Sequence, residues 1–151
     1  MIYPISHIQR LRRNVIKQDL PRPPEFDQAT DDQIQSVYNG IGSDKFSNIL
    51  KITTDVFEAF EASALIHDFG WSELWNDGSR ERWTVSNNRF REGNLILAST
   101  CGVWFGWLRP QQRTIYRAAG DALYRVVASD DIGWPIWRDA EHCEPGPEVM
   151  A

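Results

Sequence analysis

The sequence predicts an all-α protein, and three features of the chain lead to that prediction. Apolar residues recur along most of the chain at the three- and four-residue spacing of an amphipathic helix. Typical helix starts and stops, such as a capping box and Asn-Gly or Asp-Gly pairs, separate these segments. No segment is a convincing strand. The expected helices run from about residue 4 to 18, from Thr30 to Tyr38, from Phe46 to the region of His67, from Ser79 to Leu97 and from Pro110 to about Ser129.

The length of 151 residues fits one domain with a packed core. We divide the chain into an N-terminal helix with a proline-rich arm (1–30), a helical domain (31–130) and an extended C-terminal tail (131–151). The formal charge of −5 and the lack of a broad basic face argue against a nucleic-acid partner. One local basic group is expected to form a solvated helix face or a partner contact: Arg10, Arg12, Arg13 and Lys17.

The cysteines and the apolar runs indicate the compartment. Cys101 and Cys143 lie far apart and match no metal-ligand spacing, so a zinc site or a disulfide framework is not expected. Residues 1–17 lack the continuous apolar core of a signal peptide, and no run reaches the roughly 18 apolar residues of a membrane span. We therefore expect a soluble protein that is made in the cytoplasm, without a signal peptide or a transmembrane segment.

Five segments are expected to lie outside the helices. Prolines exclude a helix in residues 20–26, which should form an extended arm. The glycine-bearing loop at 39–43 can turn its carbonyls or amides toward a ligand, although a plain turn between helices explains the same residues. Residues 76–79 predict a turn followed by a helix cap. Residues 102–108 read as a large loop, and the tail from Trp134 as extended chain with little secondary structure.

Potential chemistry is concentrated in one place, the adjacent His67 and Asp68 at the end of an apolar stretch. On a helix, His67 shares a face with Trp71, one turn later. That helix is either continuous or broken near Ala62-Ser63. The next helix should pack antiparallel to it, and Asn87 and His67 each lie about ten residues from the intervening turn. We therefore expect Asn87 beside His67, while a His-Asp pair taken alone is more often structural than catalytic.

The order of these features is distinctive. A glycine-containing loop precedes a helix that ends in His-Asp-Phe-Gly-aromatic, and a turn leads to a helix with a polar residue three before a Phe and then to a tyrosine-bearing last helix. This order resembles the prokaryotic branch of the phospholipase A2-like fold, and small phage-encoded proteins with the same His-Asp signature. The resemblance covers roughly Asn39 to Val127. It implies two antiparallel core helices that carry the His-Asp site, plus a third packing helix.

The resemblance also implies roles for individual residues. In that family the His is the general base that takes a proton from water, and the following Asp binds calcium. By resemblance, His67 is the base and Asp68 a calcium ligand, with the carbonyls of Gly40 and Gly42 completing the calcium shell. Imidazole has a suitable pKa for such a base, and calcium can hold a phosphate and a developing oxyanion. The implied reaction is calcium-dependent hydrolysis of an acyl ester in a phospholipid.

Two residues depart from the family pattern. Asn87 stands where the family has an Asp that orients the catalytic His, and Trp71 stands in place of a Tyr. An amide can hydrogen-bond an imidazole, but it does not stabilise the imidazolium and it can hold the wrong tautomer. Two functions therefore stay open. One is a hydrolase weakened by Asn87, and the other is a catalytically degenerate subunit with a structural or accessory role in a phage particle or a related assembly.

Further features bear on the partners. A group of aromatic residues could form a patch for a lipid surface, while core packing or a protein contact explains them equally well: Trp71, Trp75, Trp104, Phe105 and Trp107. The two terminal arms suggest docking into a larger protein assembly. A His-Asp metal-dependent phosphohydrolase needs more histidine ligands than the chain offers, because only His7 and His142 remain and both lie in terminal segments.

Overall fold

The computed structural model of the chain describes residues 3–39, 54–100 and 109–139, with side chains from 58 in the second range and from 112 to 138 in the third. The described residues form seven helices and no strand, which confirms the all-α prediction. The helices are α1 (Ile5–Lys17), α2 (Pro24–Gln28), α3 (Asp31–Val37), α5 (Thr54–Trp71), α6 (Arg80–Thr100), α7 (Arg109–Val127) and α8 (Gly133–Asp139).

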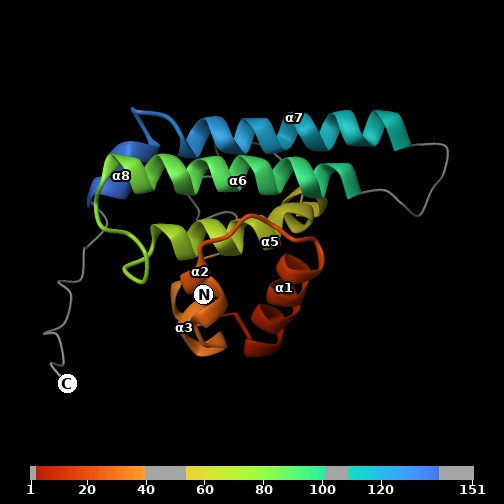
Figure 1. The fold of residues 1–151 in the computed structure, drawn as a ribbon. Coiled ribbons are helices and arrows are strands. Elements are labelled where there is room, and N and C mark those ends of the chain that lie inside the picture. The colour runs from red at the N-terminus through yellow and green to blue at the C-terminus, as the bar shows by residue number, and fades with distance from the viewer. Residues whose placement is uncertain (1–2, 40–53, 101–108, 140–151) are drawn as a thin grey trace, which may run out of the picture.

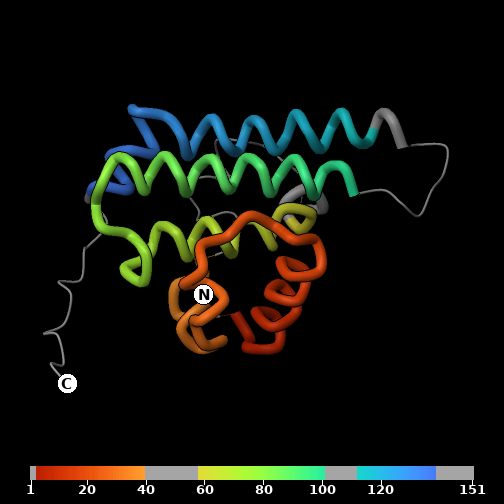
Figure 2. The backbone as a smooth tube through the Cα atoms, viewed as in Figure 1, coloured from red at the N-terminus to blue at the C-terminus, as the bar shows by residue number. Residues whose placement is uncertain are grey.

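The three longest helices form the frame of the molecule. α6 lies between α5 and α7, and each of the three runs antiparallel to its neighbour (Figure 1). The short helices α1, α2 and α3 cover the side of α5 that faces away from α6, while α8 folds back near the end of α7 (Figure 1). The tube in Figure 2 follows this path from the N-terminal layer across α5 and α6 to α7. Every layer thus contacts a neighbour through an apolar helix face.

The N-terminal helix is an integral part of this body. Its apolar residues Ile8, Leu11 and Val15 recur at three- and four-residue spacing and are almost completely buried against α5 and α3. The sequence-based helix over about residues 4–18 is therefore confirmed. The predicted capping box is also present, because the Thr30 side chain accepts from the Gln33 amide and the Gln33 side chain accepts from the Thr30 amide.

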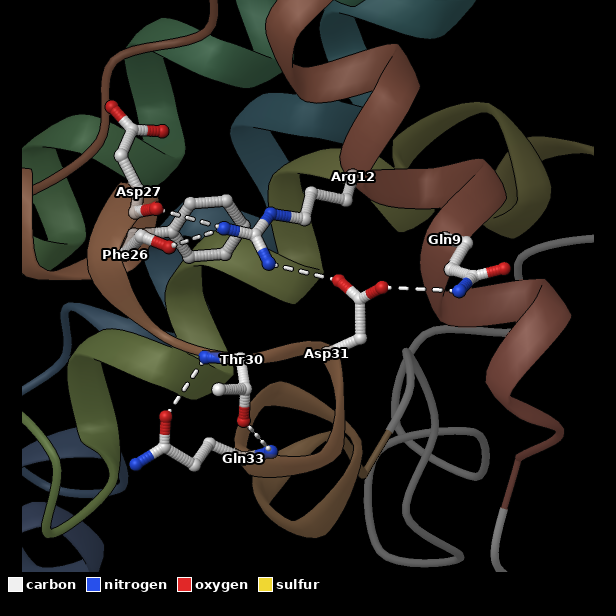
Figure 3. A network of polar contacts seen from close by, with 7 residues as sticks. All are labelled: Gln9, Arg12, Phe26, Asp27, Thr30, Asp31 and Gln33. Atoms are coloured by element: carbon white, nitrogen blue, oxygen red, sulfur yellow. Dashed lines mark hydrogen bonds and ion pairs between the residues drawn. The ribbon is translucent and has the colours of Figure 1, made fainter.

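Arg12 ties α1 to the next two helices instead of belonging to a solvated basic face. Its guanidinium donates to Asp31 at 2.8 Å and to the backbone carbonyls of Phe26 and Asp27 at 3.3 and 2.9 Å (Figure 3). Gln9 donates to the second Asp31 oxygen at 3.1 Å (Figure 3). These hydrogen bonds fix the start of α3 against α1.

We predict that this network makes stability depend on pH through Asp31. The bonds from Arg12, and then Gln9, hold the pKa of Asp31 below its ordinary value of 3.8. A folded-state pKa below the unfolded one stabilises the protein fully above about pH 4, and this gain is lost as pH falls through the folded-state pKa. Asp31→Asn should therefore lower the free energy of unfolding by about 1 kcal/mol at neutral pH and by less in acid.

Urea unfolding at pH 7 and pH 3 measures this difference. Asp32→Asn is the control, because Asp32 also lies in the first turn of α3 but is exposed. If the two variants lose the same free energy of unfolding at pH 7, the role of Asp31 is contradicted.

Residues 20–26 were expected to be extended, but the proline-rich segment is only partly so. It contains α2, which begins at Pro24. Proline is compatible with the first position of a helix, because the amide it lacks would have no partner there. Phe26 in α2 is fully buried and meets Phe69 of α5 edge-on, with ring centroids 5.4 Å apart. This aromatic contact fastens α2 to the core.

Small residues let α5 and α6 approach closely, and α5 is continuous through Ala62-Ser63. A Cβ added to Gly93 would lie 2.8 Å from the Ser63 Oγ atom, and one added to Gly70 would lie 2.5 Å from the Ser86 Oγ atom. The Ser63 hydroxyl donates to the Phe90 carbonyl at 3.2 Å. Ser63 therefore marks a close helix crossing and not a helix break.

The turn between these helices agrees with the prediction. Gly78 has φ of 76°, in the left-handed region, and its amide donates to the Asn76 side chain at 2.7 Å. The Ser79 hydroxyl accepts from the Arg82 amide at 3.2 Å and caps α6. This turn sets the register in which α6 returns along α5.

The C-terminal part differs from the prediction in two ways. The tail forms α8, where Trp137 is fully buried, so the expected extended chain from Trp134 was wrong up to Asp139. Ile115 in α7 has the helical spacing of an inward-facing apolar residue, yet it is 59% exposed. Packing of two indoles, Trp137 against Trp71 and Trp134 against Trp83, explains α8, because seven residues are too few for a stable isolated helix. No helix within the described ranges has the length and apolar character needed to cross a membrane.

Candidate functional site

His67 and Asn87 lie side by side on α5 and α6, as the antiparallel packing predicted. The His67 Nε2 atom and the Asn87 Oδ1 atom are 3.3 Å apart. Both residues are buried, with 7% and 2% of their surface exposed. The pairing follows from the turn at residues 76–79, which places positions equally distant from it at the same level.

The orientation of the Asn87 amide is set by α7. Its Nδ2 atom donates to the Val127 carbonyl at 3.3 Å. That carbonyl is in the last residue of α7, where helix carbonyls have no partner within the helix. A carbonyl only accepts, so the NH₂ group must face Val127 and the Asn87 oxygen must face His67.

This orientation selects one tautomer of His67. Since the Asn87 oxygen accepts, the His67 Nε2 atom carries the proton and donates, which leaves Nδ1 as the acceptor of a neutral ring. A carboxylate at position 87 would select the same tautomer. In this geometry the amide favours the tautomer that an aspartate would favour, and Asn87 differs from aspartate in its charge and in the N–H group that it donates to Val127.

Aromatic rings fix the imidazole plane. The His67 ring contacts both Trp71 and Phe90, with centroid distances of 4.7 Å to each. Trp137 of α8 meets Trp71 edge-on at 5.5 Å. Gly133 packs so closely that an added Cβ would overlap the Val127 carbonyl. Two residues of α8 therefore pack against the site: Trp137 against the tryptophan beside His67, and Gly133 against the carbonyl that orients Asn87.

Asp68 lies on the more exposed edge of the site. Its Oδ1 atom is 3.8 Å from the His67 Nδ1 atom, beyond hydrogen-bond distance, and its side chain is 17% exposed. Its Oδ2 atom accepts from the Asn39 amide at 2.9 Å. Asp68 thus joins the chain after α3 to the end of α5 and leaves Oδ1 beside the acceptor nitrogen of His67.

The described residues do not assemble a calcium site by themselves. Calcium takes six to eight oxygen ligands, and within the described part of the chain no three acidic, histidine or cysteine side chains group around a common point. One oxygen of Asp68 is already engaged by the Asn39 amide. Gly40 and Gly42, the other expected ligands, lie outside the described residues, as do Trp104, Phe105 and Trp107 of the expected aromatic patch.

A partly buried polar cluster on the face of α5 that carries Asp68 was not expected from the sequence. Glu61, two helical turns before Asp68, lies 3.3 Å from Arg10 and 3.6 Å from His7. The Tyr38 hydroxyl is buried and has no hydrogen-bond partner within the described part of the chain. Burial, with Glu61 and Asp68 adding to it, raises the pKa of Tyr38 far above its ordinary value. Tyr38 therefore stays protonated and able to donate. The seven-residue spacing of the two acids is the signal that could have revealed this shared face.

No family model, no curated protein and no solved structure matches this chain.

Proposed function

We propose that this protein is a phospholipase A2-like hydrolase of acyl esters, with His67 as its general base. The observation that carries the proposal is the chain of hydrogen bonds from His67 through Asn87 to Val127. A base for ester hydrolysis needs an unprotonated nitrogen held in a fixed direction. These hydrogen bonds keep the ring proton on Nε2 and leave Nδ1 unprotonated. Together with the two neighbouring aromatic rings, they hold the imidazole in one orientation.

In the proposed reaction, the His67 Nδ1 atom takes a proton from water while the water oxygen bonds to the acyl carbon. The carbonyl oxygen becomes an oxyanion in the tetrahedral intermediate. Collapse of the intermediate breaks the ester bond, and the leaving alkoxide takes the proton from Nδ1. The products are a fatty acid and a lysophospholipid, and the imidazole returns to its neutral form. Asn87 keeps the Nε2 proton in place throughout.

We also propose Asp68 as a ligand of calcium, with the carbonyls of Gly40 and Gly42, on the strength of the family resemblance. Bound calcium would supply a positive charge for the phosphate and for the oxyanion. Its involvement is tested separately from that of His67, by comparing rates in calcium and in a chelator.

We predict that fatty-acid release from mixed phosphatidylcholine micelles depends on His67. His67→Gln should lower the rate of hydrolysis by roughly 10³-fold, because a general base typically contributes about 10²- to 10⁴-fold to the rate. His7→Gln, which changes a histidine that contacts Glu61 and not His67, should keep the wild-type rate. A correctly folded wild-type protein that releases no fatty acid at high calcium would contradict the proposal.

A second candidate function is a structural or accessory subunit of a phage particle or a related assembly, with the same fold and no turnover. Asn87 favours it, because an amide keeps the geometry of the site without the charge that stabilises an imidazolium. Such a subunit should bind a co-expressed protein of the assembly. A purified chain that stays monomeric and binds none of them would contradict this function.

A further inference from the structure

Two arginines of α6 hold their guanidinium groups against one tryptophan. The Cζ atoms of Arg82 and Arg89 lie 4.9 and 5.0 Å from the ring centroid of Trp75. The two arginines are seven residues apart on α6, so they share a face two turns apart. Trp75 is 7% exposed and comes from the turn before α6. The indole therefore limits the movement of both cations.

The charges of these arginines are not balanced equally. Arg82 pairs with Asp77 at 3.2 Å and also donates to the Trp75 carbonyl. Arg89 is half-buried, and no described carboxylate lies within ion-pair distance of it. Its Nη1 atom is buried and has no acceptor among the residues that the structure describes. A desolvated guanidinium without a counter-charge is unfavourable unless an anion joins it.

The electrostatic surroundings of Arg89 are mixed. Burial lowers the pKa of Arg89, and it is the largest effect on that group. The charge of Glu25 in α2 raises this pKa, and the smaller effect of Arg82 lowers it. Arg89 therefore has a carboxylate in its neighbourhood but, among the described residues, none in direct contact.

We propose that Arg82 and Arg89 form a binding site for a phosphate group above Trp75. Arg89 offers a positive charge that no described carboxylate pairs with, and Arg82 adds a second guanidinium that also contacts Asp77. The planar arrays of N–H donors of the two groups match the oxygens of a phosphate. Because Trp75 already orders both side chains, little further entropy is lost on binding. The site is distinct from His67, which contacts Asn87 and Phe90 on a different face of α6.

Titration of the full chain with inorganic phosphate, at constant ionic strength, tests this site. Arg89→Met keeps an unbranched apolar stem against Trp75 and removes the guanidinium. We expect the thermal midpoint of the wild type to rise with millimolar phosphate, and Arg89→Met to bind at least roughly tenfold more weakly. Arg91→Met, two residues further along α6 at an exposed position, is the control and should bind like the wild type.

Vesicles distinguish a free phosphate from a lipid headgroup. Binding to phosphatidic acid vesicles and not to phosphatidylcholine vesicles, lost in Arg89→Met, would assign the site to a phosphomonoester lipid. Binding of inorganic phosphate alone would assign it to a soluble phosphate compound. If the wild type binds neither, or if Arg89→Met binds as tightly as the wild type, the proposal is overturned. Should Arg89→Met fail to fold, Arg89→Lys keeps the charge, loses the paired N–H geometry and should still weaken binding.

Discussion

Replacing Asn87 with aspartate is expected to raise ester hydrolysis by roughly 10² to 10⁴-fold. The upper limit is the loss that the reverse change, Asp to Asn, causes in the catalytic triad of a serine protease. The Asn87 oxygen already accepts from the His67 Nε2 atom, so an aspartate oxygen could take the same position. The gain would come from the negative charge, which stabilises the imidazolium formed during attack of water. Fatty-acid release from mixed micelles measures it.

The same substitution should also destabilise the fold. Asn87 donates to the Val127 carbonyl, and a carboxylate in its place would put two acceptors against each other. Loss of a buried hydrogen bond with an unsatisfied partner costs about 1–3 kcal/mol. Activity and stability should therefore change in opposite directions, which separates a direct effect on His67 from a general improvement of folding.

Asn94 offers a matched control for this experiment. It is a buried asparagine on the same helix, two turns after Asn87, and its amide donates to the Gly120 carbonyl of α7 at 3.4 Å. Asn94→Asp should cost a similar free energy of unfolding and leave the rate of hydrolysis unchanged. If Asn87→Asp is no more active than Asn94→Asp, the role given to position 87 is contradicted.

The second large effect is expected at Trp137. Its side chain is fully buried and packs edge-on against Trp71, which in turn lies against His67. Trp137→Ala should lower the free energy of unfolding by about 3–5 kcal/mol, the usual range for removing a buried aromatic ring. Urea unfolding measures this loss, and hydrolysis should fall with it because Trp71 loses its support.

Ile136→Ala is the control for Trp137, because the neighbouring side chain is 43% exposed. Ile136→Ala should lower the free energy of unfolding by no more than about 0.5 kcal/mol. Equal stability of the two variants would mean that α8 does not fasten onto the core in solution.

Much of the fold follows from local sequence patterns. The apolar spacing in α1, the capping box at Thr30 and the turn before Ser79 each depend on residues close together in the chain. The pairing of His67 with Asn87 also follows, since a short turn between two long helices leaves one antiparallel register. These features need no knowledge of distant contacts.

The features that sequence patterns missed depend on tertiary contacts. α2 and α8 are too short to be stable alone. Phe26 holds α2 against α5, while Trp137 and Trp134 hold α8 against α5 and α6. Ile115 fits a helical stripe, but it is exposed because neighbouring helices cover only part of α7. Likewise, the buried Nη1 atom of Arg89, which has no acceptor among the described residues, becomes visible only when its neighbours are known.

The protonation of His67 is the central claim about the site, and long-range ¹H–¹⁵N correlation NMR of the imidazole measures it directly. We predict a protonated Nε2 and an unprotonated Nδ1 in the neutral ring, because the Asn87 oxygen accepts from Nε2. Asn87→Leu should remove this preference. A wild-type ring protonated at Nδ1 would contradict the account, since the nitrogen that is to receive the proton from water would then already carry one.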